Sequence, residues 1–141
     1  MSRVAIVTGA ARGIGKAICE ALKADGFTVV ANYAGNDQAA EEFTARTGIP
    51  TYKFDVADFD ACKKGIAAIE SDLGPVDVLI NNAGITRDGV MHRMTYDQWE
   101  KVIHTNLSSC FNMCRNVIDG MRERGFGRIV NIGSVNGQAG Q

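Results

Sequence analysis

The sequence alternates between short apolar runs and amphipathic segments, and this alternation constrains the fold more than any other feature. Apolar runs of strand length are RVAIVT (3–8), FTVVANY (27–33), TYKFDV (51–56), VDVLIN (76–81) and RIVNIG (128–133). Several are continuous rather than alternating in hydrophobicity, which is typical of strands covered on both faces. Strands that alternate with helices predict an α/β fold with a doubly wound parallel sheet. Right-handed crossovers then give the expected strand order 3-2-1-4-5.

The first three intervening segments have helical periodicity and recognisable ends. One begins near Gly13 and ends at Gly26, which is a suitable residue to follow a helix. The next covers about 37–47. The third covers about 58–72, with Asp58 as its candidate N-cap.

The fourth helical segment is the longest. Thr95 and Gln98 have the spacing of a capping box at its start. Apolar residues then recur with the period of one helical face, which predicts a single helix packed on the sheet. These residues are Trp99, Val102, Ile103, Leu107, Cys110, Phe111, Cys114, Val117, Ile118 and Met121.

Length and composition are consistent with one domain over residues 1–141. Hydrophobic residues make up 45% of the chain, which is enough for a core. The net charge of −1 does not predict binding to nucleic acid or to an anionic membrane. Apolar runs are far shorter than a bilayer span, and MSRVAIVTGA lacks the apolar core of a signal peptide. We therefore expect a cytoplasmic protein with neither a nucleic-acid nor a membrane partner.

The four cysteines do not predict a metal site. Cys110 and Cys114 lie four residues apart on one expected helix, but no further histidine or cysteine has a matching spacing. We expect these thiols to be reduced and to act as small core residues.

A glycine-rich loop, TGAARGIG, follows the first strand and opens the first helix. Its glycines are Gly9, Gly13 and Gly15. Glycines let the backbone approach a pyrophosphate, and a helix N-terminus offers free N–H groups and a favourable dipole. The context favours a cofactor site that includes Ile14, although the same glycines would also make a tight turn.

The end of the second strand bears on the choice between NAD and NADP. An acidic residue there binds the ribose hydroxyls of NAD. This sequence has Asn32 and Tyr33 at that place, and the nearest acid is Asp37. Arg12, in the glycine loop, is a candidate partner for the extra phosphate of NADP. NADP is therefore favoured, with a solvated surface arginine as the alternative reading of Arg12.

Two further strand ends carry candidate cofactor residues. Asp55 and Val56 end the third strand, where a carboxylate would bind an adenine amine or would cap the next helix. After the fourth strand, Asn81 and Asn82 precede a pair of small residues, Ala83 and Gly84. This pattern allows close backbone approach to a cofactor and is also common in ordinary turns.

Asn106 and Ser134 are the remaining polar candidates. Asn106 falls within the apolar stripe of the fourth helix, where an amide is unfavourable unless it is hydrogen-bonded. Ser134 follows the fifth strand. Neither His92 nor His104 forms a recognisable triad with it, so we interpret Ser134 as a hydrogen-bond donor and not a nucleophile.

Together these motifs resemble the short-chain dehydrogenase/reductase family. TGAARGIG, NNAG, TN at 105–106 and IGS ending on Ser134 have its order and spacing across the chain. The resemblance implies a Rossmann-type fold and a nicotinamide cofactor held by residues 9–15. It places Asp55 near the adenine and lines the cofactor site with Asn81 and Gly84. Asn106 and Ser134 would belong to a catalytic Asn–Ser–Tyr–Lys set.

Two longer stretches, NNAGITRDGVMHRMTYDQWEKVIHTNL and CFNMCRNVIDGMRERGFGRIVNIGSVNGQAGQ, resemble the branch that reduces β-ketoacyl thioesters. This resemblance implies NADPH-dependent reduction of a small-molecule acyl-CoA, acetoacetyl-CoA in particular, by a homotetramer. Asp88, Gln138 and Gln141 are its candidate substrate contacts, or else ordinary polar loop residues. The alternatives are reduction of a carrier-protein thioester and a non-catalytic NADP-binding module.

The tyrosine and lysine of that catalytic set are not found in this sequence. None of Tyr33, Tyr52 and Tyr96 begins a Tyr-x-x-x-Lys motif, which the family places shortly after the serine. We therefore expect this sequence to be the N-terminal portion of a longer reductase and to end before the last strands of the sheet. These 141 residues alone are expected to bind a dinucleotide weakly and to lack reductase activity.

Overall fold

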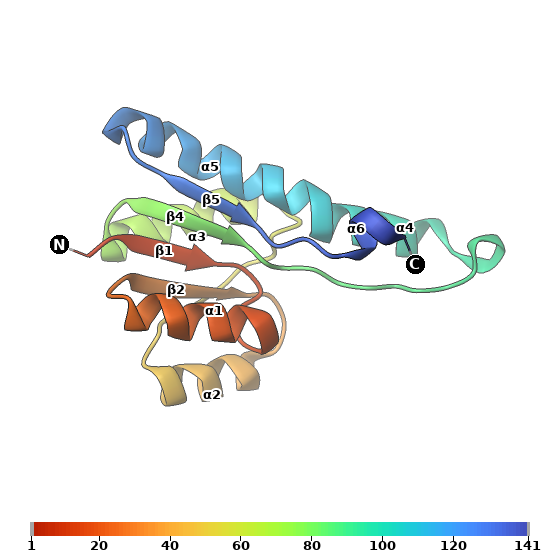
Figure 1. Ribbon diagram of the computed structural model, residues 1–141, viewed down its shortest axis with the longest axis horizontal. Helices are drawn as coiled ribbons and strands as arrows, with labels where there is room; N and C mark the ends of the chain where they lie inside the picture. Colours follow the sequence, from red (N-terminus) through yellow and green to blue (C-terminus); the bar gives the residue numbers. More distant parts are fainter. Residues whose placement is uncertain (1, 141) are drawn as a thin grey trace.

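Parallel strands form one five-stranded sheet in the order β3-β2-β1-β4-β5. Figure 1 shows β2, β1, β4 and β5 side by side in this order. The computed structural model describes residues 2–140. The strands are β1 (Val4–Val7), β2 (Thr28–Tyr33), β3 (Thr51–Lys53), β4 (Val76–Asn81) and β5 (Arg128–Asn131). In the centre of the sheet, Val7 is paired with Ala31 of β2 and with Ile80 of β4. The predicted fold class and strand order are confirmed.

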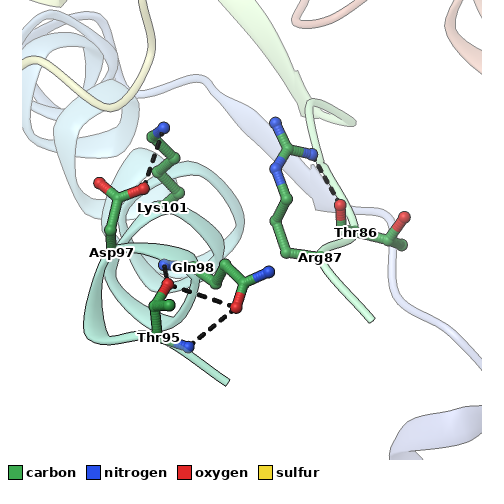
Figure 2. A network of polar contacts seen from close by, with 6 residues as sticks. All are labelled: Thr86, Arg87, Thr95, Asp97, Gln98 and Lys101. Atoms are coloured by element: carbon green, nitrogen blue, oxygen red, sulfur yellow. Dashed lines mark hydrogen bonds and ion pairs between the residues drawn. The ribbon is translucent and has the colours of Figure 1, made fainter. Parts of the chain in front are cut away.

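The helices begin and end close to the predicted residues. They are α1 (Gly13–Ala24), α2 (Asp37–Thr47), α3 (Phe59–Leu73), η1 (Met91–Arg93), α4 (Tyr96–Ile103), η2 (His104–Ser108), α5 (Ser109–Arg124) and α6 (Asn136–Ala139). The Asp58 carboxylate accepts a hydrogen bond from the Ala61 N–H at 3.0 Å, as expected of an N-cap. Figure 2 shows the reciprocal capping box of Thr95 and Gln98 at the start of α4.

Each face of the sheet is covered by its own hydrophobic layer. Helices α3 and α5 pack on one face, and α1 and α2 pack on the other. Cys62 is buried in the first layer and Cys19 in the second. Burial raises the pKa of each thiol to about 12, so both are neutral. These two act as small core residues, as predicted, whereas Cys110 and Cys114 are only partly buried.

The fourth predicted helix is interrupted in its middle. A π-helical turn, η2, separates α4 from α5 and includes Asn106. A π turn contains more residues than an α turn, so it shifts the direction of every side chain that follows it. The apolar residues from Trp99 to Met121 therefore do not form one continuous buried stripe.

This interruption corrects two sequence predictions. Leu107 and Phe111 were expected to face the core, but they are 64% and 63% exposed, and Trp99, which precedes the π turn, is 53% exposed. Asn106 was expected among buried residues and is also exposed. The buried face of α5 comprises Ser109, Asn112, Met113, Val117 and Met121. The Asn112 amide is bonded there to the Val56 carbonyl at 2.9 Å, so a different asparagine is the satisfied core amide.

Residues 2–140 include no helix that is both long and apolar enough to cross a membrane. In the same part of the chain, no three His, Cys, Asp or Glu side chains are grouped to hold a metal ion. β5 is the last strand in the sheet order, and its Val130 side chain is 45% exposed. The segment between β4 and α4 runs outward past the arrowheads of the strands (Figure 1).

Candidate functional site

A cavity of about 630 Å³ opens at the carboxyl ends of the central strands. In doubly wound sheets, ligands bind at this edge, where the strand order reverses. Most of the predicted cofactor residues line the cavity. They are Gly9, Arg12, Gly13, Ile14, Gly15, Asn32, Asp55, Val56, Ala83 and Gly84. The topology therefore gathers residues from the end of β2 and from the loops after β1, β3 and β4 into one site.

The glycine loop is wound tightly against the segment that follows β4. Gly9 and Gly13 have φ values of +59° and +58°, a conformation that favours glycine. A Cβ atom on Gly9 would lie 2.9 Å from the Ala83 Cα. On Gly15 it would lie 2.6 Å from the Asn82 Nδ2 and 2.7 Å from the Gly9 carbonyl oxygen. These positions require glycine even without a bound ligand.

Thr8 joins the ends of β1 and β4, a contact that was not predicted from the sequence. Its hydroxyl oxygen accepts hydrogen bonds from the N–H groups of Asn82 at 3.0 Å and Ala83 at 2.9 Å. The Asn82 amide in turn donates to the carbonyl oxygens of Thr8 at 2.9 Å and Gly9 at 3.1 Å. Thr8 is 1% exposed. The sequence feature that could have indicated Thr8 is its place as a polar residue at the end of a continuous apolar run.

Asn32 holds the other side of the glycine loop by hydrogen bonds to the backbone. Its Oδ1 accepts from the Gly9 N–H at 3.3 Å, and its Nδ2 donates to the Phe54 carbonyl at 2.9 Å. The side chain is 2% exposed. Asn32 thus lines the cavity while its amide holds the loops after β1 and β3 against β2.

The nearest acid after β2, Asp37, is paired with neighbouring side chains. Lys53 forms an ion pair with Asp37, with Nζ 2.9 Å from Oδ1, and the Tyr33 hydroxyl donates to the same carboxylate at 3.0 Å. These two contacts lower the pKa of Asp37, in that order of strength. Among the described residues that line the cavity, Asp55 is the only acid and Arg12 the only base. A phosphate at the end of β2 would therefore meet no unpaired carboxylate from Asp37.

Asp55 shapes the loop after β3 and does not cap the next helix. Its Oδ1 accepts from the Ala57 N–H at 2.9 Å, and the cap of α3 is Asp58. The turn at Asp55 also ends β3 at Lys53, earlier than the sequence predicted. Asp55 is among the residues that line the cavity.

Asn81 and Asn82 point to different places. The Asn81 amide donates to the Asn131 Oδ1 at 2.9 Å and so joins β4 to β5. Asn81 is 6% exposed and is not among the described residues that line the cavity. Asn82, its neighbour, lines the cavity and binds the glycine loop. Adjacent residues of a strand face opposite ways. The sequence Asn81-Asn82 does not by itself show which of the two faces the cavity.

The π turn brings Asn106 onto the segment that follows β4. Its Nδ2 donates to the Ile85 carbonyl at 2.9 Å, and its Oδ1 accepts from the Ile85 N–H at 2.8 Å. A second cavity of about 530 Å³ adjoins this pair and is lined by Asp88 and Asn106 among others. Ile85 lines both cavities, so they share a wall.

Nearby, Arg87 is turned back onto its own segment. Figure 2 shows its guanidinium directed at the Thr86 carbonyl, with Nη1 2.7 Å from the oxygen. Arg87 also lines the second cavity.

Ser134 and Gln138 are exposed and lie on the loop and short helix after β5. The Asn136 N–H donates to the Ser134 Oγ at 3.2 Å. Neither Ser134 nor Gln138 is among the described residues that line the two cavities. Gln141, the third substrate candidate, lies outside the described residues.

The larger cavity has the chemistry that a dinucleotide requires. Its volume is within the range of about 300–1,000 Å³ that is usual for ligand pockets. Arg12 is the N-cap residue of α1 and makes no side-chain capping hydrogen bond. The first N–H groups of α1 are therefore available to a phosphate. A Cβ on Gly13 or Gly35 would meet no atom of the described chain within 4 Å, so the cradle beside them is open.

Comparison with known proteins agrees with the fold class. The family model for short chain dehydrogenase matches residues 3–141, and the chain belongs to this family. An acetoacetyl-CoA reductase of Rhizobium meliloti (strain 1021) is 63% identical over 141 residues, which are 100% of this chain and 58% of the relative. The motif-based resemblance is confirmed.

Two further relatives show the range of similarity. An acetoacetyl-CoA reductase of Paracoccus denitrificans is 62% identical over 138 residues, which are 98% of this chain and 57% of the relative. A 3-oxoacyl-[acyl-carrier-protein] reductase of Vibrio harveyi is 40% identical over 140 residues, again 98% and 57% of the two chains. The chain therefore spans less than two thirds of the length of these relatives.

Proposed function

We propose that the full-length protein is a cytoplasmic, NADPH-dependent reductase of β-ketoacyl thioesters that converts acetoacetyl-CoA to 3-hydroxybutyryl-CoA. The cavity at the carboxyl ends of the strands is the observation that carries this proposal. It joins the glycine loop, Asp55 and the loop after β4 in one place. The relatives at 62–63% identity, which are acetoacetyl-CoA reductases, support the choice of substrate.

The chain's own residues have distinct tasks in this proposal. The α1 N-terminus binds the pyrophosphate, Arg12 the additional phosphate, and Asp55 the adenine amine. Bound NADPH supplies the hydride that reduces the β-keto carbon. Ser134 donates a hydrogen bond to the carbonyl oxygen, where negative charge develops. Asp88, Gln138 and Gln141 contact the thioester.

Asn106 has a positioning task. Its side chain holds Ile85 by two hydrogen bonds and so fixes the segment that separates the two cavities. In the family, the proton donor is the tyrosine of a Tyr-x-x-x-Lys motif, which none of the three tyrosines of this sequence begins. The proposal therefore assigns dinucleotide binding, without turnover, to residues 1–141 when they are alone.

Reductase activity is tested with acetoacetyl-CoA and NADPH on the full-length protein. We expect Ser134→Ala to lower kcat by about 100-fold or more, because a donor to the developing oxyanion is lost. NADPH affinity should be unchanged. Ser71→Ala, an exposed position on α3, is the matched control. A Ser134→Ala enzyme with the parent kcat would remove Ser134 from the mechanism.

NADP preference is tested separately through Arg12. We expect Arg12→Ala to weaken NADPH binding by about ten- to a hundredfold, the usual worth of a hydrogen bond to a charged group. NADH binding should change little, because NADH lacks the additional phosphate. Isothermal titration with both cofactors measures the difference, and Arg46→Ala, an exposed arginine of α2, is the control. An equal loss for both cofactors would contradict the assignment.

Carrier-protein thioesters are the second candidate substrates. The Vibrio harveyi relative, a 3-oxoacyl-[acyl-carrier-protein] reductase, is 40% identical, against 63% for the relative from Rhizobium meliloti. Comparison of kcat/KM for acetoacetyl-CoA and for the same acyl group on a carrier protein discriminates between them. A protein that binds NADP(H) but reduces neither thioester would be the non-catalytic module.

A homotetramer is the proposed assembly of the full-length protein. The exposed ring of Phe111 on α5 stacks on Phe59 of α3, with ring centroids 6.1 Å apart. Leu107 beside it is also exposed. Exposed apolar side chains of this kind are common at contacts between subunits.

A further inference from the structure

Asn136 and Gly137 form the only Asn-Gly pair in the sequence. In such a pair, the backbone nitrogen of the glycine can attack the carbonyl carbon of the asparagine side chain. A C–N bond forms, ammonia leaves, and a cyclic succinimide results. Water then opens the ring to aspartate or to isoaspartate, whose backbone passes through the former side chain. Glycine permits the attack because it has no Cβ to obstruct it and adopts many backbone conformations.

The structure leaves this pair accessible. Asn136 and Gly137 are exposed, and a Cβ on Gly137 would meet no atom of the described chain within 4 Å. The Gly137 N–H donates to the Ser134 carbonyl at 3.1 Å, and this bond must open before the nitrogen can attack. Gly137 belongs to α6, a helix of four residues that are all exposed. So short a helix without packing opens readily.

Other asparagines of the chain are held by hydrogen bonds or followed by larger residues. Asn36 is exposed like Asn136, but its Oδ1 accepts the Ala39 N–H at 3.0 Å and the next residue is an aspartate. Asn106 is bonded at both ends of its amide. Within residues 2–140, the side-chain amide of Asn136 has no protein partner. Among the asparagines that the structure describes, only Asn136 is followed by glycine, exposed and without a side-chain partner.

We propose that Asn136 is a site of spontaneous deamidation, with water as the co-reactant, and that its conversion to isoaspartate displaces Ser134. The second part follows from one contact, because the Asn136 N–H donates to the Ser134 Oγ at 3.2 Å. Isoaspartate inserts an extra carbon into the backbone beside this N–H, and the new carboxylate repels a substrate oxygen that becomes negative. This part rests on the proposed function of Ser134.

The modification is tested by incubating the full-length protein at mildly alkaline pH and physiological temperature. Peptide mapping by mass spectrometry, with isoaspartyl methyltransferase as the probe, measures conversion at each asparagine. We expect Asn136 to convert at least about tenfold faster than Asn36, and Gly137→Ala to remove this difference. Gly133→Ala, at another open glycine nearby, should leave the rate unchanged. Conversion at Asn136 no faster than at Asn36 would overturn the proposal.

Activity is followed in the same samples. We expect reductase activity to fall in proportion to isoaspartate in the parent protein and to persist in Gly137→Ala. Conversion without loss of activity would overturn the link to Ser134. Fresh protein without any reductase activity would instead refute the proposed function, and the mass measurement would still decide whether Asn136 is the modification site.

Discussion

Gly15→Ala is expected to abolish dinucleotide binding and to lower the free energy of unfolding by about 3 kcal/mol or more. Gly15 is buried in the first turn of α1. The new methyl group would lie 2.6 Å from the Asn82 Nδ2, 2.7 Å from the Gly9 carbonyl oxygen and 2.8 Å from the Ala10 Cα. Two of these atoms belong to the backbone of the glycine loop, so relief of the overlap would move the loop itself.

Urea unfolding of the full-length protein and NADPH titration together measure this effect. Gly35→Ala is the control for stability, since Gly35 also lines the cavity but has open space around its Cβ position. Its free energy of unfolding should stay within about 0.5 kcal/mol of the parent. If Gly15→Ala were as stable as the Gly35→Ala control, the tight packing of the loop would not be needed for the fold.

Thr8→Val is expected to destabilise the protein by about 2–4 kcal/mol, although valine has almost the same shape. The hydroxyl accepts from two backbone N–H groups, those of Asn82 and Ala83. Each would lose its buried partner, and an unsatisfied buried donor costs about 1–3 kcal/mol. The segment after β4 should then loosen, so NADPH binding should weaken in parallel.

Thr8→Ser retains the hydroxyl and supplies the control. It loses one methyl group and should be destabilised by about 1 kcal/mol, with NADPH affinity close to that of the parent. Denaturant unfolding and hydrogen exchange at Asn82 and Ala83 measure both variants. Equal destabilisation by valine and serine would show that the methyl group and not the hydroxyl matters at this position.

Much of the fold could be predicted because one kind of signal dominates it. Apolar runs buried on both faces, separated by capped amphipathic helices, are compatible with few topologies. Local chemistry placed the helix ends, as at Asp58 and Thr95, because a cap depends on residues only three positions apart. The glycine loop was recognised for the same reason.

Features that depend on contacts distant in sequence were not predicted. The bond between Thr8 and Asn82 joins residues 74 positions apart, and nothing near either residue indicates the other. Asn81 and Asn82 could not be separated before the direction of the strand end was known. The π turn has no reliable sequence signature, so the predicted stripe continued through it and placed Asn106, Leu107 and Phe111 on the wrong face.

Helices α4 and α5 follow one another along almost the same axis, and the π turn between them sets how far the side chains of one are rotated about that axis relative to the other. Helix α5 is oriented by the sheet, through the buried face that includes Met113 and Val117. Helix α4 instead lines the second cavity, through Trp99 and Val102. Loss of one residue from η2 would turn α4 by about 100° relative to α5, since an α-helix has about 3.6 residues per turn. The length of η2 is therefore constrained more strictly than its composition. We expect insertions to be tolerated better in the irregular stretch before η1 than in η2.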